Sequence, residues 1–221
     1  MAVALTVAAM VSPAGVRAQT AFWPDTYAAR MQALALIQTL RAEILATRSA
    51  TATLEQWCRD HALAPDPRIV ARPLPGPGPA PTAEQRQRLE IDSNEPVRYR
   101  RVQLRCGDRV LSHAENWYVP GRLSPEMIQQ LMTTDHPFGR VIEPLKPYRV
   151  TLGATLIWSP LPAGWERDRQ ALPAVVGRTI EMPDALFSQS SLVYTSDRRP
   201  IAEVREIYQR DVLAFPPPPS R

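Results

Sequence analysis

The sequence has few of the residues that bind metals. Its three histidines, His61, His113 and His136, lie far apart, and no two have the spacing of a helical metal site. Two cysteines, Cys58 and Cys106, are too few for a zinc knuckle or a disulfide-stapled miniprotein. They either pair with each other or are separate small core residues. The sequence therefore predicts no metal site, and the cysteine pairing stays open.

The sequence also lacks a strong excess of charge of one sign. It has 26 basic and 22 acidic residues, a net charge of +4, and Lys146 is its only lysine. The basic residues are spread along the chain without a basic block, so no nucleic-acid partner is expected. There is no GxSxG motif and no glycine-rich phosphate loop, which leaves hydrolase and nucleotide-binding functions without support.

No apolar run is long enough to span a bilayer. The apolar stretch at residues 2–11 is followed by a Pro-Gly break and by Val16-Arg17-Ala18, a small-x-small cleavage pattern before Gln19. This pattern predicts a signal peptide over residues 1–18 whose basic front is missing. We expect a periplasmic or secreted protein with no stable membrane insertion after cleavage. An ordinary disordered tail is the alternative.

The first part of the chain predicts two helices and a connector. Apolar residues recur at three-to-four spacing in residues 25–47, and residues 53–61 place Leu54, Trp57 and Cys58 on one face. The proline-rich stretch 65–81 is incompatible with a helix interior or a sheet and is interpreted as a linker.

Beyond residue 95 the apolar period changes to two, which indicates strands. A Gly107-Asp108 turn joins the first two into a hairpin, and Ser124-Pro125 is typical of a helix start. The pattern predicts strands 96–106, 110–119, 148–158, 186–194 and 200–208, and a helix over 125–133.

These elements define an α+β fold with an antiparallel sheet. With 221 residues, the chain can bury one substantial core. We expect N-terminal helices and a connector over 19–94, an α+β domain over 95–212 and a proline-rich tail over 213–221.

Several charged residues share strand faces with apolar residues. The alternation places Arg100 with Val102 and Leu104, Glu115 with Trp117, and Glu206 with Val204. In the strand over 148–158 it places Tyr148, Val150, Leu152, Ala154, Leu156 and Trp158 inward. Buried charges are costly unless they are paired. Either Arg100 pairs with a glutamate or lies at a frayed strand end, or Arg100 and a glutamate face one cavity. In the second case Arg100 binds a carboxylate ligand, and the glutamate, its pKa raised by burial, exchanges a proton.

The order of motifs resembles the bacterial chorismate lyase family, whose fold is shared with the UTRA-like ligand-binding domain of HutC-type regulators. The resemblance covers roughly residues 95–210. The matching pieces are Arg100-Arg101-Val102, Cys106-Gly107-Asp108, Tyr118-Val119-Pro120, Thr134-Asp135-His136-Pro137-Phe138-Gly139-Arg140, Arg199-Pro200-Ile201 and Arg205-Glu206-Ile207-Tyr208.

The resemblance implies an antiparallel sheet with helices and loops that enclose a ligand cavity, and an enzyme that eliminates pyruvate from chorismate to leave 4-hydroxybenzoate without a cofactor. The family's carboxylate-binding arginine falls on Arg100. The loop residue that meets the carboxylate falls on Phe138, and Gly139 allows its close approach. Phe138 as a simple core residue is the alternative.

The resemblance also implies an acid on the last strand. It falls on Glu206 if one residue is inserted after Pro200 and on Arg205 if none is, and Glu203 is a further candidate. A second anion-binding arginine of the family is replaced here by Glu115 or Asn116, which argues against chorismate itself.

Three functions follow. The chain is a chorismate lyase-like enzyme with Arg100 and Glu206 as catalytic residues, or a non-catalytic exported binder of a small aromatic carboxylate, or a structural protein. An exported location and the lost arginine favour the binder over the lyase.

Overall fold

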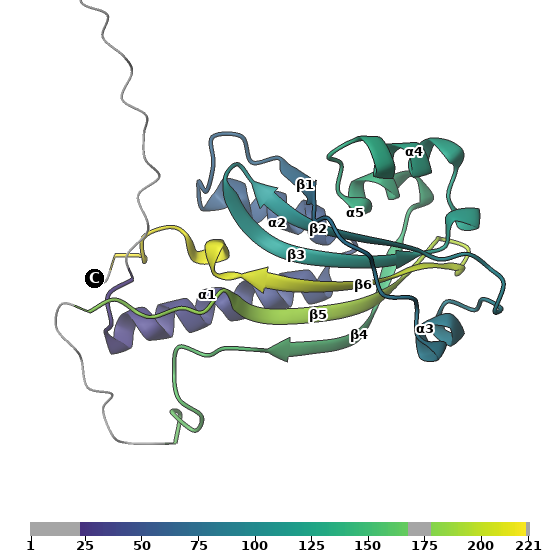
Figure 1. Ribbon diagram of the computed structural model, residues 1–221. Coiled ribbons are helices and arrows are strands. Elements are labelled where there is room, and N and C mark those ends of the chain that lie inside the picture. Colours follow the sequence, from purple (N-terminus) through teal and green to yellow (C-terminus); the bar gives the residue numbers. More distant parts are fainter. Residues whose placement is uncertain (1–22, 168–177, 220–221) are drawn as a thin grey trace, which may run out of the picture.

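The chain folds around one six-stranded antiparallel sheet (Figure 1). The computed structural model describes residues 23–167 and 178–219, so the expected signal peptide lies outside the described residues. The helices are α1 (Tyr27–Ala46), α2 (Ala50–Asp60), α3 (Ala83–Arg88), α4 (Pro125–Thr133) and α5 (Phe138–Val141), and the strands are β1 (Ile69–Pro73), β2 (Arg98–Cys106), β3 (Arg109–Tyr118), β4 (Tyr148–Leu156), β5 (Ala185–Tyr194) and β6 (Pro200–Gln209). Short 3₁₀ turns lie at Pro120–Arg122, Glu143–Leu145 and Arg210–Leu213. The predicted α+β fold class is confirmed.

The strand order is β1-β2-β3-β6-β5-β4, so the last strand of the chain lies at the centre of the sheet. β6 pairs with β3 in a register that sets Glu206 opposite Ala114 and Val204 opposite Asn116. Because successive residues of a strand point to opposite faces, these four side chains share one face. We call it the inner face.

The inner face is covered by helices. α1 and α2 lie behind the sheet in Figure 1 and pack on its inner face. This core contains Ile37, Leu40, Ile44, Leu54, Trp57, Val102, Leu104, Phe187 and Tyr208. A second cluster joins α4 and α5 to the other end of the same face, through Leu131, Phe138, Val141, Tyr118, Val193 and Val204. The two helix pairs leave a hollow between them, which is the candidate site.

A disulfide joins α2 to the sheet. Cys58 of α2 is bonded to Cys106 at the end of β2. Both side chains are buried in the same core as Trp57, whose indole N–H donates to the carbonyl of Val212 at 2.9 Å. Helix α2 is therefore fixed at its C-terminal half, and its N-terminus points to the hollow.

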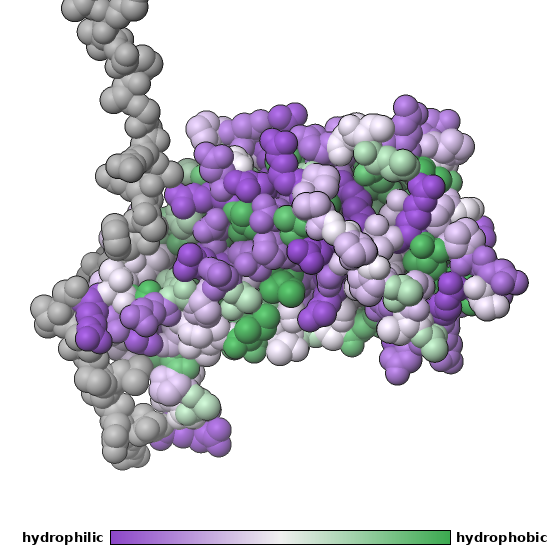
Figure 2. Space-filling model, viewed as in Figure 1, coloured by the Kyte–Doolittle hydropathy of each residue, from purple (hydrophilic) through white to green (hydrophobic). Residues whose placement is uncertain are grey.

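The outer face is largely open. Only α3 and the preceding proline-rich segment cover part of it, at the end where Trp117 donates to the carbonyl of Pro79 at 3.3 Å. Figure 2 shows hydrophilic residues gathered over β2 and β3 on this face.

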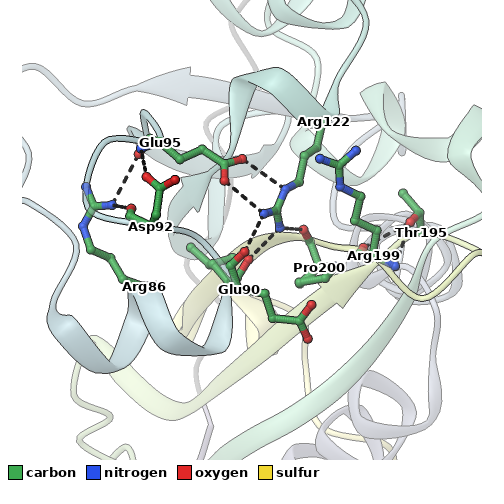
Figure 3. A network of polar contacts seen from close by, with 9 residues as sticks. Arg86, Glu90, Asp92, Glu95, Arg122, Thr195, Arg199 and Pro200 are labelled. Carbon is green, nitrogen blue, oxygen red and sulfur yellow. Dashed lines mark hydrogen bonds and ion pairs between the residues drawn. The ribbon is translucent and has the colours of Figure 1, made fainter.

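Arg122 fastens this end of the sheet (Figure 3). Its side chain is buried and donates to the carbonyls of Leu89 at 2.6 Å, Pro200 at 2.5 Å and Glu90 at 2.9 Å. A buried guanidinium that donates to three backbone carbonyls is a structural residue. It connects the end of α3 to the start of β6.

Two local predictions are confirmed. Ser124 caps α4, because its hydroxyl accepts from the Met127 amide at 3.3 Å. Gly107 forms the β2–β3 turn with a φ of +54°, a left-handed conformation that favours glycine, and a Cβ there would lie 2.9 Å from the Ala64 side chain.

The prediction that residues 65–81 join no sheet is wrong. Residues Ile69–Pro73 form β1, an edge strand paired with β2. Proline is tolerated there because an edge strand has one side without ladder hydrogen bonds. Residues 74–81 keep the predicted role of a connector.

The predicted inward face of β4 is wrong before the bulge of the strand, but beyond it Leu156 and Trp158 pack on the core of the inner face as predicted. Val150 and Leu152 are 45% and 41% exposed, and Arg149 points inward instead. A bulge between Thr151 and Gly153 breaks the alternation, and the ion pair with Glu206 stabilises Arg149 on the inner face. Because apolar residues of this edge strand point to both faces of the sheet, its sequence does not alternate regularly and does not indicate which face is buried.

Candidate functional site

A cavity lies on the inner face between the N-terminus of α2 and the helix α5. It contains about 490 Å³ of space that no atom fills, part of it open to solvent, and water centres fit in only about 40 Å³ of it. Its apolar lining includes Val102, Leu104, Ala114, Phe138, Ile142, Val193 and Val204. Its polar lining comprises Arg48, Ser49, Thr51, Asn116, Arg149 and Glu206. The hollow is narrow, so a ring-sized ligand requires side chains at its rim to move apart.

Arg149 and Glu206 form a buried ion pair in the cavity wall. Arg149 Nη2 lies 2.5 Å from the Glu206 carboxylate, and both side chains are 8% exposed. Burial lowers the pKa of the Arg149 guanidinium, but the charge and hydrogen bond of Glu206, together with Tyr208, raise it overall. Arg149 therefore stays cationic. Its Nε is buried and has no hydrogen-bond partner among the described residues.

Asn116 contributes a further polar side chain to the cavity wall. It is 4% exposed and lines the cavity from β3. Buried polar groups in proteins are normally hydrogen-bonded, so the unpartnered Nε of Arg149 in the same wall points to a ligand or water.

The N-terminus of α2 contributes backbone donors. Ser49 caps this 11-residue helix by accepting from the Ala52 amide at 3.3 Å. The amides of Ala50 and Thr51 belong to the first turn, where N–H groups have no intrahelical acceptor. Both residues line the cavity. A helix N-terminus favours anions through these donors and the helix dipole.

The segment 135–140 closes the cavity from the side of α5. Phe138 and Gly139 both line it, as the sequence predicts for ligand contacts. Gly139 permits close approach to α2, because a Cβ there would lie 3.0 Å from the Thr51 hydroxyl. Phe138 also packs against Tyr118, with ring centroids 5.9 Å apart, so it is at once a core residue and a cavity wall.

Two contacts hold this segment down. The amide of Ala71 in β1 donates to the carbonyl of Asp135 at 2.6 Å. Arg140 pairs with Glu55 of α2 at 2.5 Å. Helices α2 and α5 thus meet at the rim of the cavity, where the Arg140–Glu55 ion pair joins them.

Arg100 lies beside the cavity, not in its lining. It is on the inner face, opposite Asn116, and its Nη2 donates to the carbonyl of His136 at 3.2 Å. Its Nη1 is buried and has no partner among the described residues. Burial lowers the pKa of Arg100, and Tyr118 opposes this shift. No ion pair joins Arg100 to a glutamate in the part of the chain that the structure describes, and its role as ligand anchor stays a prediction.

The two candidate glutamates of β6 lie on opposite faces. Glu206 faces the cavity, whereas Glu203 is buried on the outer face and accepts from Arg88 at 2.7 Å and from Gln85 at 3.1 Å. Glu206 is the inward acid of the cavity. The prediction of a free acid that exchanges protons there did not include its Arg149 partner.

The inward placement of Glu115 is wrong. Glu115 lies on the outer face, where its carboxylate accepts from the Tyr99 hydroxyl at 2.6 Å. Burial and this hydrogen bond raise the pKa of Tyr99 to about 12. The resemblance places either Glu115 or Asn116 at the position of the family's second arginine. Of these two residues, only Asn116 lines the cavity.

Sequence reasoning missed Arg149 and the first turn of α2. The predicted helix began at Thr53, three residues too late, because Ala50 and Thr51 carry no apolar signal, although Ser49 is a usable cap. Arg149 was assigned to the outward parity of β4. An arginine between Tyr148 and Val150 in an otherwise uncharged strand was the signal that could have found it.

Other classes of site gain no support from the described residues. In that part of the chain no group of three or more His, Cys, Asp or Glu side chains could hold a metal ion. None of the helices described there combines the length and the apolarity that crossing a bilayer requires.

Comparison with known structures finds proteins of similar fold, some of them described as transcriptional regulators. PhnF of Mycobacterium smegmatis aligns over 80% of this chain and 71% of its own, with a TM-score of 0.48 and 14% identity. The ligand-binding domain of a protein described as a GntR-family transcriptional regulator, from Bordetella bronchiseptica, aligns over 65% of this chain and 84% of its own, with a TM-score of 0.42 and 18% identity. The predicted periplasmic or secreted location is corrected by this finding, because the similar structures include proteins described as GntR-family transcriptional regulators.

Comparison of sequences places the chain in a family. No family model matches it. The uncharacterized protein y4mC of Sinorhizobium fredii is 43% identical over 197 residues, which cover 89% of this chain and 83% of that protein. The chain therefore belongs to the same protein family as y4mC.

Proposed function

We propose that the protein binds a small organic carboxylate, with an aromatic or similarly flat apolar body, in the cavity of the inner face. The observation that carries the proposal is the buried Nε of Arg149, which lines the cavity and has no hydrogen-bond partner among the described residues. Buried polar donors without acceptors are costly unless a ligand supplies the acceptors.

The chemistry of the lining defines the ligand class. Donors converge from three elements, namely Asn116 of β3, Arg149 of β4 and the first turn of α2. Phe138 and the valines of β2, β5 and β6 form the apolar remainder. Pockets with an apolar wall and a few convergent polar groups typically orient a ligand by its polar end. Here a carboxylate at the donors and a ring against Phe138 satisfy both parts.

The ligand has to enter past the contact between α2 and α5. The free space accommodates a few water molecules, because one water needs a cavity of roughly 10–15 Å³. Opening the rim separates Gly139 from Thr51 and breaks the Arg140–Glu55 pair. The pair is part-exposed, so its loss is a small barrier of about 1 kcal/mol or less.

The test is a thermal-shift screen of benzoate and 4-hydroxybenzoate against their neutral amides. At a ligand concentration 100 times Kd, binding stabilises the fold by about 2.7 kcal/mol, which raises Tm by roughly 5–10 °C. The amides are matched in shape and lack the charge, so they produce a much smaller shift. Equal shifts from acid and amide contradict a carboxylate site, and no shift from any flat acid contradicts the proposal as a whole.

A pair of neighbouring variants locates the site. Asn116→Leu removes the cavity amide and weakens binding roughly tenfold or more, as for a hydrogen bond to a charged group. Glu115→Gln, one residue away on the outer face, leaves the affinity unchanged. Isothermal titration with the best acid measures both.

A second candidate function is elimination of pyruvate from chorismate. One observation favours it: Glu206, the acid that the family resemblance implies, lines the cavity. Losing the enolpyruvyl group makes the ring aromatic, so the protein has mainly to orient the dianion and polarise the ether oxygen. The ion pair with Arg149 keeps a counter-ion beside that acid. Incubation with chorismate and a lactate dehydrogenase coupled assay tests for pyruvate, and Glu206→Gln should abolish any release.

A further inference from the structure

The outer edge of β4 is open. β4 is the terminal strand of the sheet, and no described strand pairs with its outer side (Figure 1). The opposite terminal strand, β1, is partly covered, because the amide of Ala71 donates to the carbonyl of Asp135. The sheet therefore presents one row of unpaired backbone N–H and C=O groups, along Tyr148–Leu156.

The composition of β4 does not protect this edge. Its nine residues include one charged side chain, Arg149, which is turned into the cavity and paired with Glu206. There is no lysine or proline in the strand, the residues that usually block edge pairing. The bulge between Thr151 and Gly153 bends the strand without covering it.

Apolar side chains also concentrate here. Val150 is 45% exposed, Leu152 is 41% exposed, and Ile157, just beyond the strand, is 48% exposed. They are half of the six large apolar residues that are exposed in the described chain. Figure 2 shows hydrophobic residues over β5 and β4 along the lower border of the molecule.

We propose that this edge pairs with β4 of a second copy of the chain, in an antiparallel two-fold arrangement. The one charged side chain of β4 is turned into the cavity, so the strand offers no charge complementarity to a foreign acidic or basic partner. Antiparallel pairing with a second copy sets β4 against its own apolar side chains. Such an isologous contact satisfies both edges at once and closes, so it yields a dimer and not a fibre. The two sheets then form one continuous sheet across the dimer axis.

Dimer formation would act on the strand that carries Arg149. A paired β4 has less freedom to fray, so the cavity cation is held more firmly in a dimer than in a monomer. The dimer proposal does not depend on the ligand, and either can fail without the other.

The mass of the full chain in solution tests the proposal. Sedimentation velocity at tens of micromolar should give twice the chain mass of 24.7 kDa. A variant with Val150→Lys and Leu152→Lys should sediment as a monomer, because two charges would face their own copies across the axis. Both sites are exposed, so circular dichroism should show an intact fold. Met132→Lys, at a 67% exposed site on α4, is the matched control and should remain dimeric.

Cross-linking gives a second measurement that does not require the dimer to be broken. The chain has two cysteines, and both are in the disulfide. Leu152→Cys therefore introduces the single free thiol, which should oxidise to a covalent dimer at low protein concentration, whereas Met132→Cys should not. A monomeric mass together with cross-linking no faster than in the control overturns the proposal. A dimer that persists in the double-lysine variant overturns it as well.

Discussion

The ion pair between Arg149 and Glu206 gives a sharp test of how the cavity is built. Glu206→Gln keeps the shape of the side chain and removes its charge. Arg149 is then a buried cation with no acid beside it, and its other side-chain hydrogen bond is to the Ser191 hydroxyl at 3.3 Å. Breaking a buried pair by removing one partner typically costs 3–5 kcal/mol. Both side chains are 8% exposed, so solvent screens little of this loss.

The amide of the variant can still accept one hydrogen bond, which places the expected loss at the lower end, about 3 kcal/mol. For a chain of this size that corresponds to a fall in Tm of roughly 6–12 °C. Glu203→Gln is the matched control, on the same strand and the opposite face. Its partner Arg88 is 34% exposed and also lies 3.5 Å from Glu84, so we expect a loss of about 1 kcal/mol.

Urea unfolding of both variants measures the difference. A carboxylate ligand should stabilise Glu206→Gln more than the wild type, because Arg149 then has no internal acid to satisfy it. Equal losses in the two variants, or a more stable Glu206→Gln protein, would refute the view that Arg149 depends on an acid inside the cavity.

Three further predictions concern stability. Gly107→Ala should destabilise the fold by about 1–2 kcal/mol in urea unfolding, since alanine is strained at φ +54° and meets Ala64; an unchanged midpoint would contradict this. Reducing the Cys58–Cys106 disulfide, which closes a separation of 48 residues, should lower the free energy of unfolding by about 4 kcal/mol in the chain-entropy model. A loss of unfolding free energy much below 1 kcal/mol would indicate that packing alone holds α2 on the sheet. Burial lowers the pKa of His61, against the charge of Asp60, so the unfolded state binds a proton more readily and stability should fall as the pH drops below about 6.5. His61→Phe should reduce this dependence of the free energy of unfolding on pH. An unaltered dependence would show that another group causes it.

The parts of the fold that follow from local pattern were predictable. The apolar stripe of α1, the Gly107 turn and the Ser124 cap are each specified by a few neighbouring residues. The central place of β6 is a long-range pairing with β3, which no local period reveals. The edge strands were the least predictable. β1 is short and contains proline, and β4 alternates around a bulge.

The candidate site shows the same division. Phe138, Gly139, Asn116 and Glu206 came from motif positions and line the cavity. Arg149 came from no motif, and its inward direction depends on a glutamate 57 positions away. A charge in a strand has no preferred face until its partner is known, so its placement is a tertiary property that sequence alone leaves undetermined.

The central position of β6 has a consequence for biosynthesis. β3 is complete at Tyr118, but β6, its second neighbour in the sheet, begins only at Pro200, near the end of the chain. Throughout the intervening translation the nascent chain carries a β2–β3 hairpin with one bare side, an arrangement prone to wrong pairing. The cavity of the inner face cannot close on the ribosome until the last strand emerges, so truncated products should be insoluble.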